Sequence, residues 1–174
     1  MGEIDKIESH IERLVCLVRN ATLRRVLHKI DPDPQLNFWR VSYGNLTDVA
    51  VIEWCKTFGE DSEDGHWKNV VSDPNSFRTE MLNQLKIDRG EWDAYWQQMK
   101  LYRNKVAVHA SHSSKVTDYP CFDVALESAF FYFQPCNLSL MDREGYRFIA
   151  LLLQLRDTHL LLVSGFLQRG SVRI

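Results

Sequence analysis

Apolar residues recur at intervals of three and four along the first thirty residues of the chain. Because an α-helix completes a turn in 3.6 residues, this spacing gathers them on one helical face. The positions that define the face are Ile4, Ile7, Ile11, Leu14, Val15, Val18, Val26 and Ile30. The sequence DPDP at 31–34 follows, and each proline disfavours helix in the residue before it. The pattern predicts one long amphipathic helix that ends near residue 30.

A second helix is predicted from about Leu36 to Phe58, followed by the acidic, glycine-bounded sequence GEDSEDG at 59–65. The apolar positions of this helix are Phe38, Val41, Val49, Ile52 and Trp54. The acidic segment does not have the ligand spacing of an EF-hand, so we expect a solvated loop. Trp67, two residues after it, is expected to anchor in the core.

Two further helices have recognisable start signals. Asp73 precedes Pro74, which combines an N-cap with proline at the first helical position. Asp88 is followed three residues later by Glu91, which predicts a capping box. The helix after Asp73 carries Phe77, Met81, Leu82 and Leu85. The helix after Asp88 is expected to run to about Ala110 and carries Trp92, Tyr95, Met99, Tyr102 and Val106.

The remaining sequence predicts one loop followed by two helices. The polar segment 111–120 is expected to be a loop, and a short helix is expected from Asp123, although its aromatic run also fits a strand. A last long helix is expected from Asp142. These elements together predict an all-α fold, a bundle of five to six helices in a single domain spanning residues 1–174.

Composition and charge narrow the class of protein. Apolar residues make up 45% and charged residues 25%, as in ordinary globular proteins. The net charge of −2 gives no global positive field, so a nucleic acid must be held by a local basic patch. The apolar run at 148–167 is long enough to span a bilayer. Arg156, Asp157 and His159 at its middle favour a buried helix instead, and no membrane association is expected.

The cysteines and the N-terminus indicate a compartment. The four cysteines lie far apart without a C-x-x-C pair, which fits neither a zinc site nor a small disulfide scaffold. They are Cys16, Cys55, Cys121 and Cys136. The charged N-terminal sequence MGEIDKIESHIERL lacks the apolar core of a signal peptide. We therefore expect a cytoplasmic protein with reduced thiols in its core.

The sequence MKLYRNKVAVHASH at 99–112 places Arg103 and His109 six residues apart, with Asn104 directly after the arginine. On a helical wheel the arginine and the histidine lie about 60° to either side of Val106, roughly 9 Å apart along the axis. Both therefore flank the apolar stripe, whereas Asn104 points nearly opposite. That separation suits a groove shared by two copies of the helix across a two-fold axis better than one phosphate held by a single helix.

Arginine and histidine are the residue types that RNA cleavage needs. RNA carries its own nucleophile, the ribose 2′-hydroxyl, and the reaction requires proton transfer near neutral pH, which His109 can supply. It also requires a cation for the developing phosphorane charge, and the guanidinium of Arg103 matches phosphate oxygens. The expected substrate is RNA and not DNA, with no cofactor. Further RNA-binding candidates around the motif are Lys100, Lys105, His112 and Lys115.

Simpler roles fit the same residues. Arg103 can pair with a carboxylate and lay its stem along the stripe, and His109 can contact the last carbonyls of its helix. Lysines on a solvated helix face need no ligand. His109 and His112 have a spacing that metal ligands use, but Asp118 is the single candidate for a third ligand, so no metal site is expected.

RNKVAVH resembles the R-x(4–6)-H motif of HEPN domains (higher eukaryotes and prokaryotes nucleotide-binding), whose nuclease form often has Asn after the arginine, as at Asn104. Together with the upstream IEWCKTFGEDSEDGHWKNVV, the motif is similar to abortive-infection U-type HEPN proteins over roughly 39–167. In one branch of such toxins a tyrosine two residues after the histidine is modified. Ser111 stands there in this chain, so that control is not expected.

The resemblance implies an all-α homodimer in which the two motif helices meet, and metal-independent endoribonuclease activity in a toxin–antitoxin or anti-phage system. Arg103 and His109 would be the catalytic pair and Asn104 a polar helper. The resemblance also suggests His66 and Trp67 as a structural lid or recognition edge. An antitoxin is a further candidate partner. Some family members keep the fold without the nuclease, so a silent module that binds RNA, nucleotide or a protein partner is the alternative.

Overall fold

The computed structural model describes residues 3–104 and 119–133. The chain divides into two units, residues 1–138 and 139–174, and the described residues all belong to the first. Several predictions fall outside the described residues: the helix continuing to Ala110, most of the loop at 111–120, the helix from Asp142 and the buried apolar run. A single domain over the whole chain also stays a prediction.

The described residues form five α-helices and one 3-10 turn and contain no strand, which confirms the all-α helical bundle. The elements are α1 (Glu3–Ile30), α2 (Asn37–Phe58), η1 (Trp67–Asn69), α3 (Pro74–Leu85), α4 (Arg89–Tyr102) and α5 (Asp123–Tyr132). The segment after Phe122 is helical, so its alternative interpretation as a strand is wrong. None of the helices in this part of the chain is both long and apolar enough to cross a membrane.

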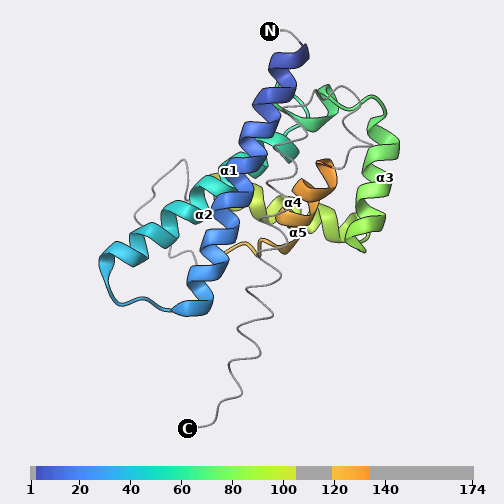
Figure 1. Ribbon diagram of the computed structural model, residues 1–174. Coiled ribbons are helices and arrows are strands. Elements are labelled where there is room, and N and C mark those ends of the chain that lie inside the picture. Colours follow the sequence, from blue (N-terminus) through green and yellow to red (C-terminus); the bar gives the residue numbers. More distant parts are fainter. Residues whose placement is uncertain (1–2, 105–118, 134–174) are drawn as a thin grey trace. The chain divides into compact units, whose positions relative to one another are not determined.

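Helices α1 and α2 form a hairpin and lie side by side (Figure 1). Leu14, Leu17 and Val18 of α1 are fully buried. The hydroxyl of Tyr43 donates to the carbonyls of Leu27 and Asp31, 2.6 and 2.8 Å away. Since Leu27 lies in the last turn of α1 and Asp31 directly follows the helix, one side chain from α2 satisfies the polar end of its neighbour.

The predicted apolar face of α2 is wrong at its first turns. Phe38 and Val41 are 69% and 60% exposed. The buried stripe passes instead through Tyr43, Thr47, Ala50 and Trp54. At 100° per residue, Phe38 and Val41 lie about 140–160° from Trp54, which is the opposite side of the helix. Ile30, predicted in the face of α1, is also exposed, at 65%.

Trp54 is the centre of the aromatic core. Its ring centroid lies 5.6 Å from that of Phe58, 5.8 Å from that of Trp92 and 5.4 Å from that of Tyr95. Its indole N–H donates to the Ser128 hydroxyl of α5, 3.2 Å away. Trp54 therefore links α2 with both α4 and α5. These contacts hold α4, the helix that ends next to Arg103, in place.

Helices α3 and α4 begin where their caps predict. The Asp73 carboxylate accepts from the backbone N–H of Asn75 and of Ser76, at 3.0 and 3.1 Å. Asp88 and Glu91 form the reciprocal capping box, with both hydrogen bonds at 2.8 Å. These bonds satisfy N–H groups that the first helical turn leaves without partners.

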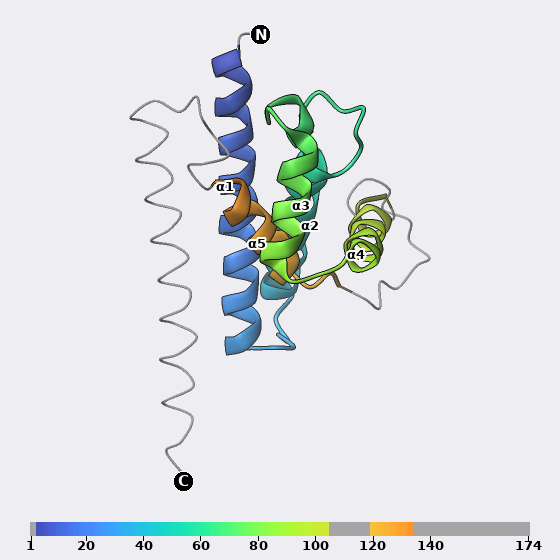
Figure 2. The same cartoon turned by 90° about the vertical axis from the view of Figure 1, so that its right-hand side faces the viewer.

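Helix α3 packs against α5, beside which it lies in the view of Figure 2. The ring centroid of Phe77 is 5.0 Å from that of Phe131 and 5.7 Å from that of Tyr132. Phe77 also stacks on Trp67 of η1, with 4.7 Å between the centroids. Trp67 is 2% exposed, so its predicted role as a core anchor is confirmed.

The described cysteines are free thiols, but they do not all lie in the core. Cys55 is buried, Cys16 is half-buried and Cys121 is exposed. The prediction that the thiols lie in the core therefore holds for Cys55 alone among these three. Cys121 precedes α5, and its thiol donates to the Asp123 carboxylate at 3.3 Å. Cys136 lies outside the described residues.

Candidate functional site

The end of α4 is held firmly by its buried face. The predicted stripe is confirmed at Trp92, Tyr95, Met99 and Tyr102, which are all buried. The Tyr102 hydroxyl donates to the Asp48 carboxylate of α2 at 2.8 Å. Burial, and then this bond, raise the pKa of Tyr102 above its ordinary range, so the donor stays protonated. Arg103 follows directly and is therefore carried on a fixed turn.

Arg103 has a carboxylate partner in the acidic loop. Its Nη1 lies 3.4 Å from Oε1 of Glu63, and the two side chains are 20% and 38% exposed. Its Nε donates to Oδ1 of Asn104 at 3.2 Å. The wheel places Asn104 on the opposite side, but its side chain bends back onto the arginine. The structure thus contains the simpler arrangement considered in the sequence analysis, in which Arg103 pairs with a carboxylate.

Lys100, one turn earlier, is paired in the same way. Its ammonium binds the carboxylate of Glu60 and lies 3.9 Å from the ring centroid of Trp96. The side chain is 19% exposed, so this lysine does not belong to a solvated face. A cation over an indole ring gains electrostatic energy from the ring's negative face. Two cations at the end of α4 therefore meet two carboxylates of one loop.

The acidic loop at 59–65 is bonded to α4 on one side. Asp61, Ser62 and Asp64 are exposed, which confirms the expectation of a solvated loop at these positions, whereas Glu60 and Glu63 are half-buried against α4. The indole N–H of Trp96 donates to the carbonyls of Phe58 and Gly59 at 2.9 and 3.1 Å. A Cβ added to Gly59 would lie 2.1 Å from the carbonyl oxygen of Cys55, so the turn requires glycine. The two ion pairs and the hydrogen bonds of Trp96 together join the loop to α4.

Asn69 of η1 fixes the far end of the loop. Its amide donates to the carbonyls of Glu63 and Asp64 at 3.0 and 3.2 Å. Inside the loop, the backbone N–H of Glu63 donates to the carbonyl of Glu60, and that of His66 to the carbonyl of Glu63, both at 3.0 Å. Glu60 and Glu63 are therefore presented by a hydrogen-bonded backbone.

His66 supports the loop and is not a proton-transfer group at neutral pH. Burial is the main reason that its pKa falls to about 4, so the ring is neutral. Its Nδ1 accepts from the backbone N–H of Lys68 at 3.3 Å, which leaves Nε2–H to donate to Asp61, also at 3.3 Å. Lys68 binds the same carboxylate and holds the pKa of Asp61 below its ordinary value.

The other half of the motif is outside the described residues. These positions are Lys105, His109, His112 and Lys115. Arg103 and Asn104 themselves have π-helical backbone geometry. A π-turn contains more residues than an α-turn, so the 100° step of the wheel does not apply at Arg103 and Asn104. The described residues contain no group of three His, Cys, Asp or Glu side chains arranged to hold a metal ion.

Sequence reasoning missed the three residues that complete the described site: Glu60, Glu63 and Asn69. One signal exists, since the loop offers several carboxylates and the motif helix several cations. Sequence spacing cannot say that Glu63 meets Arg103, forty positions away. The described part of the chain is thus an all-α protein whose acidic loop closes over the cationic end of α4. Comparisons with known proteins yield no match: no family model, curated protein or solved structure matches the chain.

Proposed function

We propose that this chain is a metal-independent endoribonuclease of the HEPN type. The observation that carries the proposal is the guanidinium of Arg103, held half-buried at the end of α4 and hydrogen-bonded to Asn104. It lies in the R-N-x(4)-H pattern that ends at His109. A pre-positioned guanidinium with donors aimed at an anion is what stabilises a phosphorane.

In the proposed reaction, His109 accepts the proton of the ribose 2′-hydroxyl, whose oxygen attacks the neighbouring phosphorus. Arg103 binds the non-bridging oxygens as negative charge develops. The bond to the 5′-oxygen breaks, and that oxygen leaves as a hydroxyl by taking a proton from the histidinium, which returns His109 to its neutral form. The products are a 2′,3′-cyclic phosphate and a 5′-hydroxyl end.

The proposed active form is a homodimer in which two motif helices meet, with RNA as the substrate and a cognate antitoxin as a further partner. Lys100, Lys105, His112 and Lys115 would contact the phosphate backbone. Lys100 and Arg103 already bind anionic oxygens in the free protein, those of Glu60 and Glu63. The carboxylates stand in for phosphates at this surface, and a bound RNA would replace them.

Glu63→Gln is expected to strengthen RNA binding. The substitution keeps the size of the side chain but removes the charge that competes for Arg103. Partly exposed ion pairs contribute up to about 1 kcal/mol, so we expect affinity to rise by a factor of up to about five. Fluorescence anisotropy with a labelled single-stranded RNA measures it. Glu80→Gln, an exposed acidic position on α3, is the control for net charge; equal effects of the two substitutions would contradict the competition.

A second function is a catalytically silent module that binds RNA, nucleotide or a protein partner. The ion pairs of Arg103 and Lys100 favour it, because a paired guanidinium can serve structure alone. In that case Arg103 contributes to binding, and no strand scission accompanies it.

The experiment that separates the two functions uses the purified full chain with single-stranded RNA and excess EDTA. We expect cleavage that is lost in His109→Ala, whereas His28→Ala, an exposed histidine of α1, cleaves like the wild type. RNA binding is measured on the same samples. Binding without cleavage supports the silent module, and His109→Ala cleaving as well as the wild type would refute the nuclease.

A further inference from the structure

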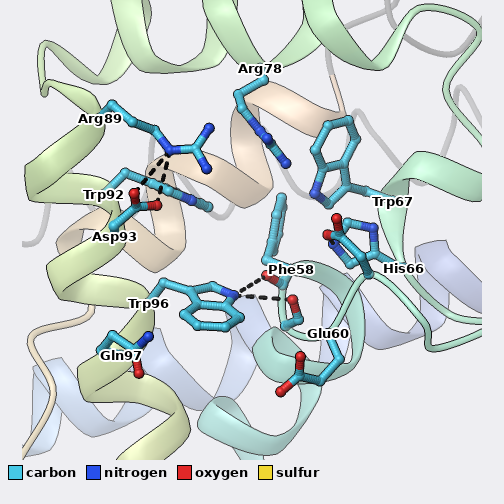
Figure 3. A pocket seen from close by; sticks show the side chains of 12 residues that line it. Phe58, Glu60, His66, Trp67, Arg78, Arg89, Trp92, Asp93, Trp96 and Gln97 are labelled. Atoms are coloured by element: carbon cyan, nitrogen blue, oxygen red, sulfur yellow. Dashed lines mark hydrogen bonds and ion pairs between the residues drawn. The ribbon is translucent and has the colours of Figure 1, made fainter.

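A cavity of about 500 Å³ opens beside the acidic loop, between the end of α2, η1 and the helices α3 and α4. Its volume is in the range of pockets that hold small molecules. The side chains that matter for the argument are Trp67, Arg78, Arg89, Trp92, Asp93 and Trp96. Figure 3 shows them around one open space, with Arg78 extending between Trp92 and Trp67.

Arg78 is the cation of this cavity without an ion pair. Its guanidinium carbon lies 5.4 Å from the ring centroid of Trp67, and no carboxylate of the described residues forms an ion pair with it. Burial, and then the positive charge of Arg89, lower the pKa of Arg78 below its ordinary value, and the charges of Asp61 and Asp93 offset a part of this. A half-buried cation beside a second cation is electrostatically unfavourable, and an anion bound between them would offset that cost.

Each carboxylate of the cavity wall already has a cation. Asp61 binds Lys68 and Glu60 binds Lys100. Asp93 accepts from Nε of Arg89 through both oxygens, at 3.0 and 3.1 Å. That arrangement leaves the terminal amino groups of Arg89 without a partner among the described residues. The charged side chains that line the cavity have a net charge of −1, and Lys68 and Lys100, which pair with two of these carboxylates from outside the lining, bring the total to +1. With His66 neutral and every carboxylate paired, this excess favours an anion of low charge over a polyphosphate.

The aromatic walls are rigid, which favours a flat ligand. Trp67 and Trp92 are 2% and 5% exposed, so each has little freedom to move and presents little surface to the cavity, whereas Trp96 is half-buried. Trp96 is fixed by its two hydrogen bonds to backbone carbonyls. Aromatic rings with fixed orientations bind planar rings by stacking or edge contacts at low entropic cost.

We propose that this cavity binds a small molecule that carries one anionic group on an aromatic ring, with Arg78 binding the anion and Trp92 and Trp96 contacting the ring. The anion is a carboxylate or a phosphate monoester. The inference does not depend on the ribonuclease proposal, since none of these residues belongs to the Arg103–His109 motif.

Three matched probes test the site on the full chain by calorimetric titration: 1-naphthoate, 1-naphthyl phosphate and the neutral 1-naphthalenemethanol. We expect at least one anion to bind and the neutral compound to bind about tenfold more weakly or not at all, because it lacks the charge-assisted hydrogen bonds. The stronger of the two anions identifies the natural chemistry. If neither anion binds in the millimolar range, or if the neutral compound binds equally well, the proposal is wrong.

Substitutions in the cavity test whether the anionic probe binds there. Arg78→Gln is expected to weaken the anion by about tenfold or more, and Arg78→Lys to restore part of the affinity. Asp93→Asn should tighten binding, because it removes a competing carboxylate from Arg89. The exposed Arg40 of α2 provides the control Arg40→Gln. Wild-type affinity in folded Arg78→Gln would overturn the assignment.

Nuclear magnetic resonance gives an independent readout, because each tryptophan contributes one indole N–H signal. The signals of Trp92 and Trp96 are expected to shift on titration with the anionic probe. Trp39 lies in the first turn of α2, is 41% exposed and serves as the internal control. A shift confined to Trp39 would place the ligand elsewhere and refute the site.

Discussion

Arg103→Gln is expected to slow RNA cleavage by a factor of about 10²–10³, the usual effect of removing one donor to a developing oxyanion. Glutamine keeps much of the stem that packs at the edge of the α4 stripe, but it has neither the charge nor the two-pronged donor set. Arg103→Lys restores charge without the fork, so it should recover a part of the rate. Single-turnover cleavage of a labelled RNA measures both variants.

The control for this substitution is Arg40→Gln, which changes an exposed arginine of α2. The ion pair with Glu63 is partly exposed, so its loss should cost at most about 1 kcal/mol of stability. A cleavage defect with little change in the unfolding midpoint therefore separates chemistry from folding. Cleavage at the wild-type rate in Arg103→Gln would remove Arg103 from the proposed mechanism.

Trp54→Ala is expected to lower the free energy of unfolding by about 3–5 kcal/mol. The residue is fully buried and contacts Phe58, Trp92 and Tyr95. Its removal leaves a cavity between α2, α4 and α5, and domains of this size are stable by only about 5–15 kcal/mol. Equilibrium unfolding in urea, followed by circular dichroism, measures the loss.

Trp39→Ala is the matched control, the same substitution in the same helix. Trp39 is 41% exposed, and its ring contacts that of the exposed Phe38. We therefore expect the free energy of unfolding to fall by less than about 1 kcal/mol. Trp54→Phe should fall between the two, because it keeps a ring but loses the bond to Ser128. Equal destabilisation by Trp39→Ala and Trp54→Ala would contradict the central place of Trp54.

Local signals predicted the described helices well. The proline pair after α1, the Asp73 cap and the Asp88–Glu91 box each act within a few residues, so sequence spacing specifies them almost completely. The α4 stripe was also predictable, because four buried residues repeat at helical intervals. The face of α2 was not, since aromatic and aliphatic residues occur on both sides of it. Tertiary contacts decide there which side is buried, and they leave Phe38 exposed.

The candidate site was likewise predictable where the signal is local and not predictable where it depends on tertiary contacts. Arg103 and Asn104 could be named from the motif, but their partner could not, because an ion pair across forty residues depends on where the loop returns. The path of the loop depends on the turn at Gly59 and on the hydrogen bonds of Trp96. Neither feature has a recognisable sequence signature. A loop predicted as solvated thus supplies the carboxylates that bind the cations of α4.

The ends of the RNA products test the central claim most directly. The purified chain is incubated with a single-stranded RNA in EDTA, and the fragments are identified by mass spectrometry. Attack by the 2′-hydroxyl, assisted by Arg103 and His109, predicts 2′,3′-cyclic phosphate and 5′-hydroxyl ends, and no cut where the scissile nucleotide carries a 2′-deoxyribose. Fragments with 3′-hydroxyl and 5′-phosphate ends, or intact RNA, would contradict it.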